Sequence, residues 1–97
     1  MEILVKKDNQ LVFELNGRLD TLTSPELEQK IKDENVNEDL ILDFKNLEYI
    51  SSAGLRVLLS TKKLLNSQGK ELTITNINDV VKEVFNVTGF INILNIK

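Results

Sequence analysis

Residues 40–65 constrain the fold of this chain more than any other segment, because a strand pattern runs almost directly into a helix pattern. Residues 40–44 (LILDF) are nearly all apolar, which is typical of a central strand covered on both faces of a sheet. Residues 53–66 carry apolar positions at three- and four-residue spacing, which predicts an amphipathic helix of about four turns. These positions are Val57, Leu58, Thr61, Leu64 and Leu65.

The segments before residue 40 predict a hairpin and a helix. Residues 3–5 and 11–15 are short apolar segments on either side of a polar stretch, which indicates a β-hairpin. Its second strand is expected to end at Asn16-Gly17. The run Ser24-Pro25-Glu26 predicts a helix start, and the helix should reach about Asp33 with Leu27 and Ile31 facing inward.

The segments after residue 66 continue the alternation. Residues 72–75 predict a strand, and the apolar stripe in residues 80–85 predicts a helix that Asn76 or Asn78 can cap. Residues 90–94 fit either a last short helix or a final strand. Because strands alternate with helices after the hairpin, we expect an α/β fold with a mixed sheet of four or five strands.

Length and composition limit the classes of function. The 97 residues suffice for one domain, residues 1–97, and the net charge of −3 lacks the basic stripe that nucleic-acid binding needs. Cysteine and histidine are absent, so we expect no metal or cofactor. The N-terminus is too soon charged for a signal peptide, and no apolar run approaches the length of a membrane span. We therefore expect a cytoplasmic protein without membrane insertion and, in the absence of a self-association pattern, a monomer.

The junction between the strand and the helix carries the candidate site. The run Ser51-Ser52-Ala53-Gly54-Leu55-Arg56 places a hydroxyl at a helix N-terminus, where backbone N–H groups are unpaired and the helix dipole favours negative charge. A phosphate could be added to Ser52 there without disrupting the fold. One serine can also serve simply as the N-cap while the other presents its hydroxyl.

Other residues near this junction have a structural and a functional interpretation. Gly54 costs about 1 kcal/mol relative to alanine in a helix, which indicates close approach of another backbone, within this domain or from a partner. Leu55 and Leu59 fall beside the apolar stripe, so we expect them to be partly exposed and to contribute to a docking surface. Asp20 follows a strand end and either stabilises a turn or lines the Ser52 loop.

Several catalytic classes lack the residues that they require. A serine hydrolase needs a base beside its nucleophile, but histidine is absent and no Ser-x-x-Lys occurs around Ser51 or Ser52. Gly54 alone does not make a phosphate-binding loop of the Walker type. A phosphoaspartate receiver would carry an acidic cluster after its first strand, where this chain has Lys6-Lys7. We therefore expect that the protein is not an enzyme.

Four segments resemble successive motifs of the STAS-domain family, and in particular of its bacterial anti-sigma-factor antagonists. They are Gly17–Asp20, Leu40–Phe44, Leu47–Leu55 and Phe85–Gly89. The resemblance spans nearly the whole chain and implies a mixed sheet packed with about four helices. It also implies partner switching, in which the unmodified protein binds an anti-sigma serine/threonine kinase and thereby frees a sigma factor.

The same resemblance implies roles for individual residues. The family's phosphoacceptor is the serine two positions before the Gly of Gly-Leu, which corresponds to Ser52. Ser51 stands where well-known antagonists often carry Asp. Phosphorylation of Ser52 would release the kinase, and a metal-dependent serine/threonine phosphatase would reset the protein. The expected partner-binding residues are Asp20, Ser51, Ser52, Ala53, Gly54, Leu55, Arg56 and Leu59. The alternative is a STAS accessory subunit of a membrane lipid-transport ATPase or a stress-signalling assembly, which would use the same surface constitutively.

Overall fold

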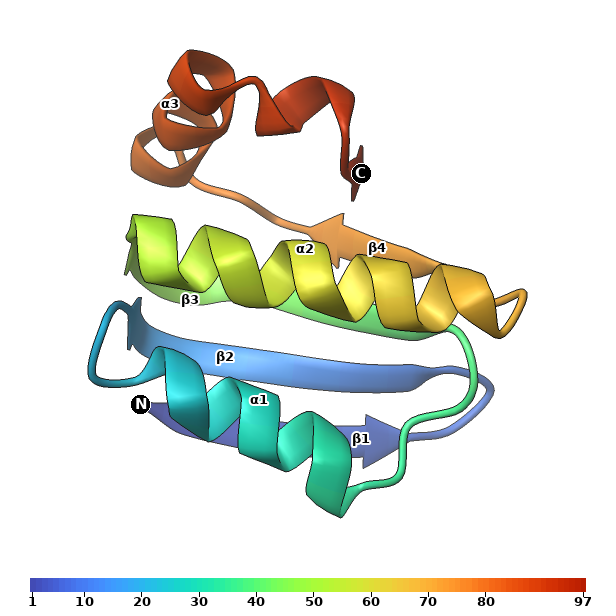
Figure 1. Cartoon of the computed structure of the whole chain (residues 1–97). Coiled ribbons are helices and arrows are strands. Elements are labelled where there is room, and N and C mark those ends of the chain that lie inside the picture. The colour runs from blue at the N-terminus through green and yellow to red at the C-terminus, as the bar shows by residue number, and fades with distance from the viewer.

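The strands join in chain order into one mixed sheet in the computed structural model, which describes residues 1–97 (Figure 1). The first pair is antiparallel, and every later pair is parallel. The predicted hairpin and the predicted mixed sheet are therefore confirmed. The strands are β1 (Glu2–Lys7), β2 (Leu11–Leu19), β3 (Leu40–Ile50), β4 (Leu72–Thr75) and β5 (Asn95–Ile96).

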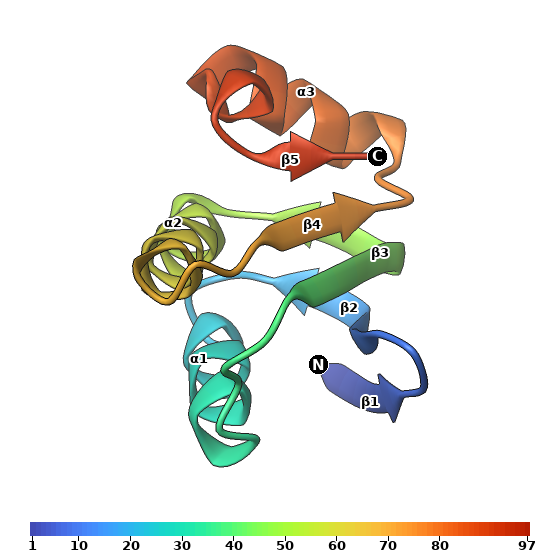
Figure 2. The same cartoon turned by 90° about the vertical axis from the view of Figure 1, so that its right-hand side faces the viewer.

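Three α-helices connect the parallel strands. α1 (Ser24–Asp33) and α2 (Ser52–Ser67) cover one face of the sheet, and α3 (Asp79–Thr88) lies beside its β4–β5 edge (Figure 2). Gly89, at a φ of +80°, ends α3, and the next residues make only a 3-10 turn, Phe90–Asn92. The expected count of about four helices thus becomes three and one short turn. None of the helices has the length and the apolar character needed to cross a bilayer.

The sheet buries only the face that carries the helices. Leu40, Leu42 and Phe44 are fully buried, whereas Ile41 and Asp43 on the opposite face are half-buried. The prediction that residues 40–44 are covered on both faces is therefore wrong. Because β2, β3 and β4 follow one another in the same direction across the sheet, right-handed crossovers place α1 and α2 on the same side of it.

β2 continues past its predicted end. Instead of stopping at Asn16-Gly17, the strand runs to Leu19 through a bulge at which the register with β3 shifts twice and Gly17 takes a φ of +108°. The extension pairs Leu19 with Ile50, the last residue of β3. The loop after β2 consequently lies against the start of α2.

Gly54 lies where α2 meets the ends of β2 and β3. A Cβ atom on this residue would lie 2.8 Å from Cγ1 of Ile50 and 2.9 Å from both Cγ and the carbonyl oxygen of Leu19. The expected close approach is confirmed, and the approaching backbone belongs to this chain.

We predict that Gly54→Ala destabilises the protein by about 1 to 3 kcal/mol in denaturant unfolding, because the added methyl group overpacks a site bounded by the Leu19 carbonyl oxygen and by two buried side chains. Helix propensity alone predicts the opposite sign, a gain of about 1 kcal/mol. The control is Ala53→Gly, which makes the opposite exchange at the neighbouring position and so measures the effect of helix propensity. It should lower the free energy of unfolding by about 0.5 to 1 kcal/mol. A stabilising Gly54→Ala would contradict the packing argument.

Candidate functional site

The junction between β3 and α2 is anchored to the end of β2. The backbone N–H of Ser51 donates to the carbonyl oxygen of Leu19 at 2.9 Å, and the carbonyl oxygen of Ser51 accepts from the N–H of Leu55 at 3.0 Å. Ser51 is the N-cap residue of α2, with extended backbone angles of −103° and 177°. The start of α2 is thus held in place by main-chain hydrogen bonds on both sides.

The two serines differ in exposure. Ser52 is the first residue of α2 and is exposed. Ser51 occupies the N-cap position, but its side chain makes no capping hydrogen bond, and its Oγ is buried without a partner. The expectation of a side-chain cap is therefore wrong. The first-turn N–H groups consequently lack both an intrahelical acceptor and a capping oxygen.

Asp20 builds the turn between β2 and α1. Its Oδ1 accepts hydrogen bonds from the N–H of Leu22 at 3.0 Å and from the N–H of Thr23 at 3.1 Å. The backbone hydrogen bond from Thr23 contributes most to holding the pKa of Asp20 below its usual 3.8, and the Thr23 hydroxyl, the Leu22 N–H and the Arg18 guanidinium act in the same direction against desolvation. Of the two expectations for Asp20, the contacts bear out the turn. Because Asp20 directly follows Leu19, this turn adjoins the Ser51 junction.

Leu22 is the residue that sequence reasoning missed. It lies within this hydrogen-bonded turn, and 85% of its surface is exposed, the largest fraction among the exposed large apolar side chains. The available signal was an apolar residue inside the polar stretch Thr21–Ser24. The turn presents an apolar side chain to solvent at the end of the molecule where α2 begins.

The two leucines of α2 differ from each other. Leu55 is only 4% exposed and belongs to the hydrophobic core, so the expectation that it is partly exposed is wrong. The reason is the close packing at Gly54, which draws the first turn of α2 onto the sheet. Leu59 is half-buried, as expected, and so is Ala53, whereas Arg56 is exposed.

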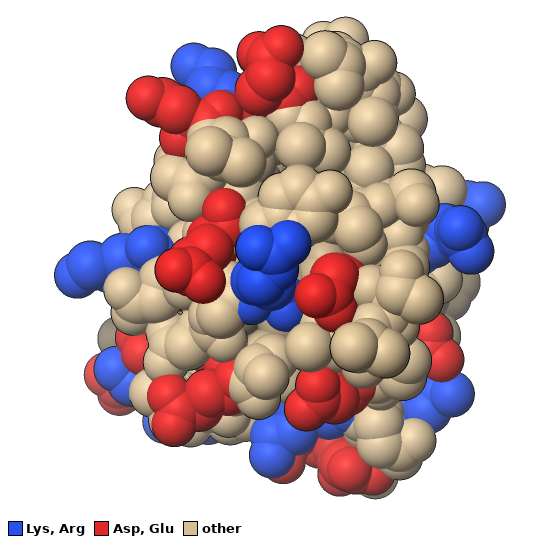
Figure 3. Space-filling view, turned by 90° about the vertical axis from the view of Figure 1, so that its left-hand side faces the viewer, with Lys and Arg blue, Asp and Glu red and all other residues tan.

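The surface next to the start of α2 is an open hollow that Ser52 itself does not line. A hollow of about 360 Å³ lies between the starts of α1 and α2, with Pro25 and Glu28 on one side and Ala53 and Arg56 on the other. Acidic and basic side chains are intermixed on this side of the molecule (Figure 3). Open hollows of this kind suit contact with a protein surface better than enclosure of a small molecule.

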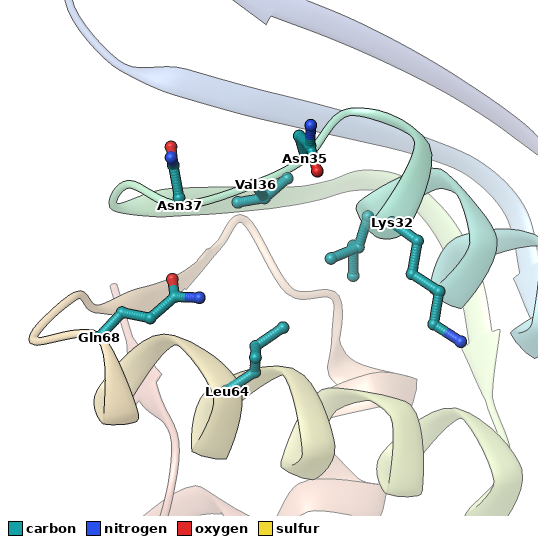
Figure 4. A pocket seen from close by; sticks show the side chains of 7 residues that line it. Lys32, Asn35, Val36, Asn37, Leu64 and Gln68 are labelled. Atoms are coloured by element: carbon teal, nitrogen blue, oxygen red, sulfur yellow. The ribbon is translucent and has the colours of Figure 1, made fainter.

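A second hollow, of about 460 Å³, lies at the other end of α2. Figure 4 shows Val36 and Leu64 facing each other across it, with Lys32, Asn35 and Gln68 at its rim. It is remote from Ser52 along α2 and contains no pair of groups suited to catalysis. The candidate site is therefore an exposed junction rather than a cleft.

Comparison with known proteins agrees with this architecture. The family model described as "STAS domain" matches residues 2–97. An anti-sigma-B factor antagonist from Staphylococcus aureus is 31% identical over 92 residues, which cover 93% of this chain and 85% of that protein. The chain belongs to the STAS-domain family.

Solved structures show the same fold. An anti-sigma factor antagonist from Mycobacterium paratuberculosis superimposes with a TM-score of 0.85 at 22% identity, over 98% of this chain and 83% of that one. The Bacillus protein SpoIIAA in its phosphorylated form gives a TM-score of 0.74 at 18% identity, over 99% of this chain and 91% of that one. The mixed α/β architecture is thus that of SpoIIAA-like STAS domains.

We predict that Asp20→Asn lowers stability at neutral pH and that its difference from the wild type shrinks in acid. A carboxylate whose pKa is depressed in the folded state stabilises that state above its unfolded pKa, and this stabilisation is lost as the pH falls through the folded value. Unfolding free energies should therefore converge below about pH 4. Asp8→Asn, at a carboxylate that accepts no hydrogen bond, is the control, and a constant difference across the acid range would contradict the prediction.

Proposed function

We propose that this protein is an anti-anti-sigma factor that works by phosphorylation-regulated partner switching. The unmodified protein binds an anti-sigma serine/threonine kinase in the cytoplasm and frees a sigma factor. The kinase then phosphorylates Ser52 and is released, and a serine/threonine phosphatase restores the hydroxyl. The observation that carries the proposal is the exposed Ser52 hydroxyl at the first position of α2, on a junction held by main-chain hydrogen bonds.

The relatives support the regulatory class. The S. aureus relative is named an anti-sigma-B factor antagonist, and SpoIIAA, solved in its unphosphorylated form, is named an anti-sigma factor antagonist. SpoIIAA has also been solved in a phosphorylated form. A phosphorylated state is thus compatible with this fold. In the proposed scheme this protein is the substrate of a kinase and not itself an enzyme.

The phosphorylation step needs only an accessible hydroxyl from this chain. The Ser52 oxygen forms a bond to the terminal phosphorus of a nucleoside triphosphate, the bond to the departing nucleoside diphosphate breaks, and the hydroxyl proton is lost. The kinase supplies the catalytic groups, and the phosphatase later transfers the phosphoryl group to water. Ser52 contributes an exposed oxygen at a fixed position.

The magnitudes favour release without unfolding. A phosphate adds about −1.5 to −2 charges and moves the formal net charge from −3 towards about −5. The helix dipole changes the stability of the domain by only about 0.3 to 1 kcal/mol. An unpaired charge buried in an interface costs about 2 to 5 kcal/mol, or about 30-fold to several-thousand-fold in affinity. The interface effect is the larger one.

The proposed partner surface is made of the exposed residues near Ser52. It comprises the Asp20 turn, the helix start at Ser52 and the exposed side of α2 at Arg56 and Leu59. Leu55 contributes indirectly, because it is buried beneath this surface, whereas Leu22 adds an exposed apolar contact. The monomer presents this surface complete, since each of these residues lies on the same chain.

We predict that Ser52→Ala abolishes phosphorylation but keeps kinase binding, because a methyl group adds no charge and Ser51, not Ser52, is the N-cap residue of α2. Ser52→Asp adds about one charge and should weaken binding less than the phosphate does. Titration of both variants and of authentic phosphoprotein against the kinase, with circular dichroism as the folding check, tests the proposal. Equal affinities for all forms would refute it and support the alternative of a constitutive accessory subunit.

We predict that Leu22→Ala lowers the affinity of the unmodified protein for the kinase by about 5- to 30-fold, equivalent to about 1 to 2 kcal/mol. Its stability should stay within about 0.5 kcal/mol of the wild type, because the side chain is already 85% exposed. Val87→Ala, at a residue of α3 that is 72% exposed, is the matched control and should change neither property. Equal affinity of Leu22→Ala and wild type would remove Leu22 from the partner surface.

A further inference from the structure

The two arginines of the chain differ in whether their guanidinium groups have a partner. The Arg18 guanidinium lies over the Tyr49 ring, with Cζ 4.7 Å from the ring centroid, and its Nε is 3.8 Å from Oδ2 of Asp20. Arg56 is exposed and forms no ion pair or side-chain hydrogen bond. Arg56 therefore carries a guanidinium without a partner in the unmodified protein.

Ser52 and Arg56 are neighbours on the surface of α2. Residues four apart in a helix have their Cβ atoms about 5 to 6 Å from each other, and pairs with the anionic residue on the N-terminal side are the more favourable. α2 has no acidic residue in its first turn, so no carboxylate of the same helix lies one turn before Arg56 to pair with it. Position 52 becomes anionic only when Ser52 is phosphorylated.

Two carboxylates at this end of the molecule are already engaged. Glu28 of α1 borders the same hollow as Arg56, but its Oε1 lies 3.6 Å from Nζ of Lys32. The Asp20 carboxylate accepts the hydrogen bonds of its own turn. Neither carboxylate forms an ion pair with Arg56, so the guanidinium can turn towards the start of α2.

Resting on the phosphorylation of Ser52 proposed above, we propose that Arg56 binds the phosphoserine of its own helix. A guanidinium makes charge-assisted and often bidentate hydrogen bonds to phosphate oxygens, which a lysine at this position would do only as a point charge. The pair stabilises the first turn of α2, where Ser51 supplies no side-chain cap. It also withdraws the Arg56 guanidinium from a partner's carboxylates, so that modification removes a donor from the surface and adds a negative charge to it.

The test measures the second pKa of the phosphate in the isolated chain. Phosphoserine is installed at position 52 during translation, in the wild type and in Arg56→Gln, Arg56→Lys and Lys63→Gln. Phosphorus NMR titration of the wild type should give a pKa below the ordinary value of about 6, and Arg56→Gln should raise it by about half a unit or more. Arg56→Lys should give an intermediate value.

Lys63→Gln is the matched control, because Lys63 is exposed on the same helix, forms no ion pair and carries the same charge. It should leave the phosphate pKa at the wild-type value. Equal pKa values for wild type and Arg56→Gln, or equal effects of Arg56→Gln and Lys63→Gln, would overturn the proposed pair. The titration contains no kinase, so it tests the Arg56 pair alone. Failure of partner switching would be seen in a separate experiment, as equal kinase affinity of the modified and the unmodified protein.

Discussion

The contact between the start of α2 and the end of β2 is the constraint on which the site depends. The Ser51 N–H donates to the Leu19 carbonyl oxygen, and the absence of a side chain at Gly54 lets the helix approach that same oxygen. This contact fixes where Ser52 emerges and draws Leu55 into the core. Because a main-chain atom bounds the space, repacking of side chains cannot readily accommodate a larger residue at position 54.

Sheet topology brings the two functional loops to one end of the molecule. β2 and β3 are parallel neighbours, so the loops that follow them both leave the sheet at the carboxyl ends of the strands. The Asp20 turn, with Leu22 at its surface, therefore adjoins the junction that carries Ser52 (Figure 1). Rigid main-chain hydrogen bonding in both loops reduces the ordering cost when a partner protein binds.

Some polar and charged side chains at this end of the molecule hold the structure together, and others are free to bind a partner. Asp20 is engaged in its turn and Arg18 lies on the Tyr49 ring, whereas Ser52 and Arg56 are exposed and form no ion pair with either residue. A charge added at Ser52 thus meets a surface whose structural ion pairs are already formed. A modification can therefore change binding while the core beneath it remains intact.

The order of strands and helices, the helix start at Ser24-Pro25 and the placement of Ser52 at the beginning of α2 could all be predicted from the sequence. These features depend on local periodicity and on backbone preferences of a few adjacent residues. Tertiary structure alone decided that one sheet face stays uncovered, that β2 passes through Gly17, that Leu55 is buried and that Leu22 is exposed. Those outcomes depend on the direction of the crossovers and on how closely α2 packs against Leu19, which are contacts between residues far apart in the chain.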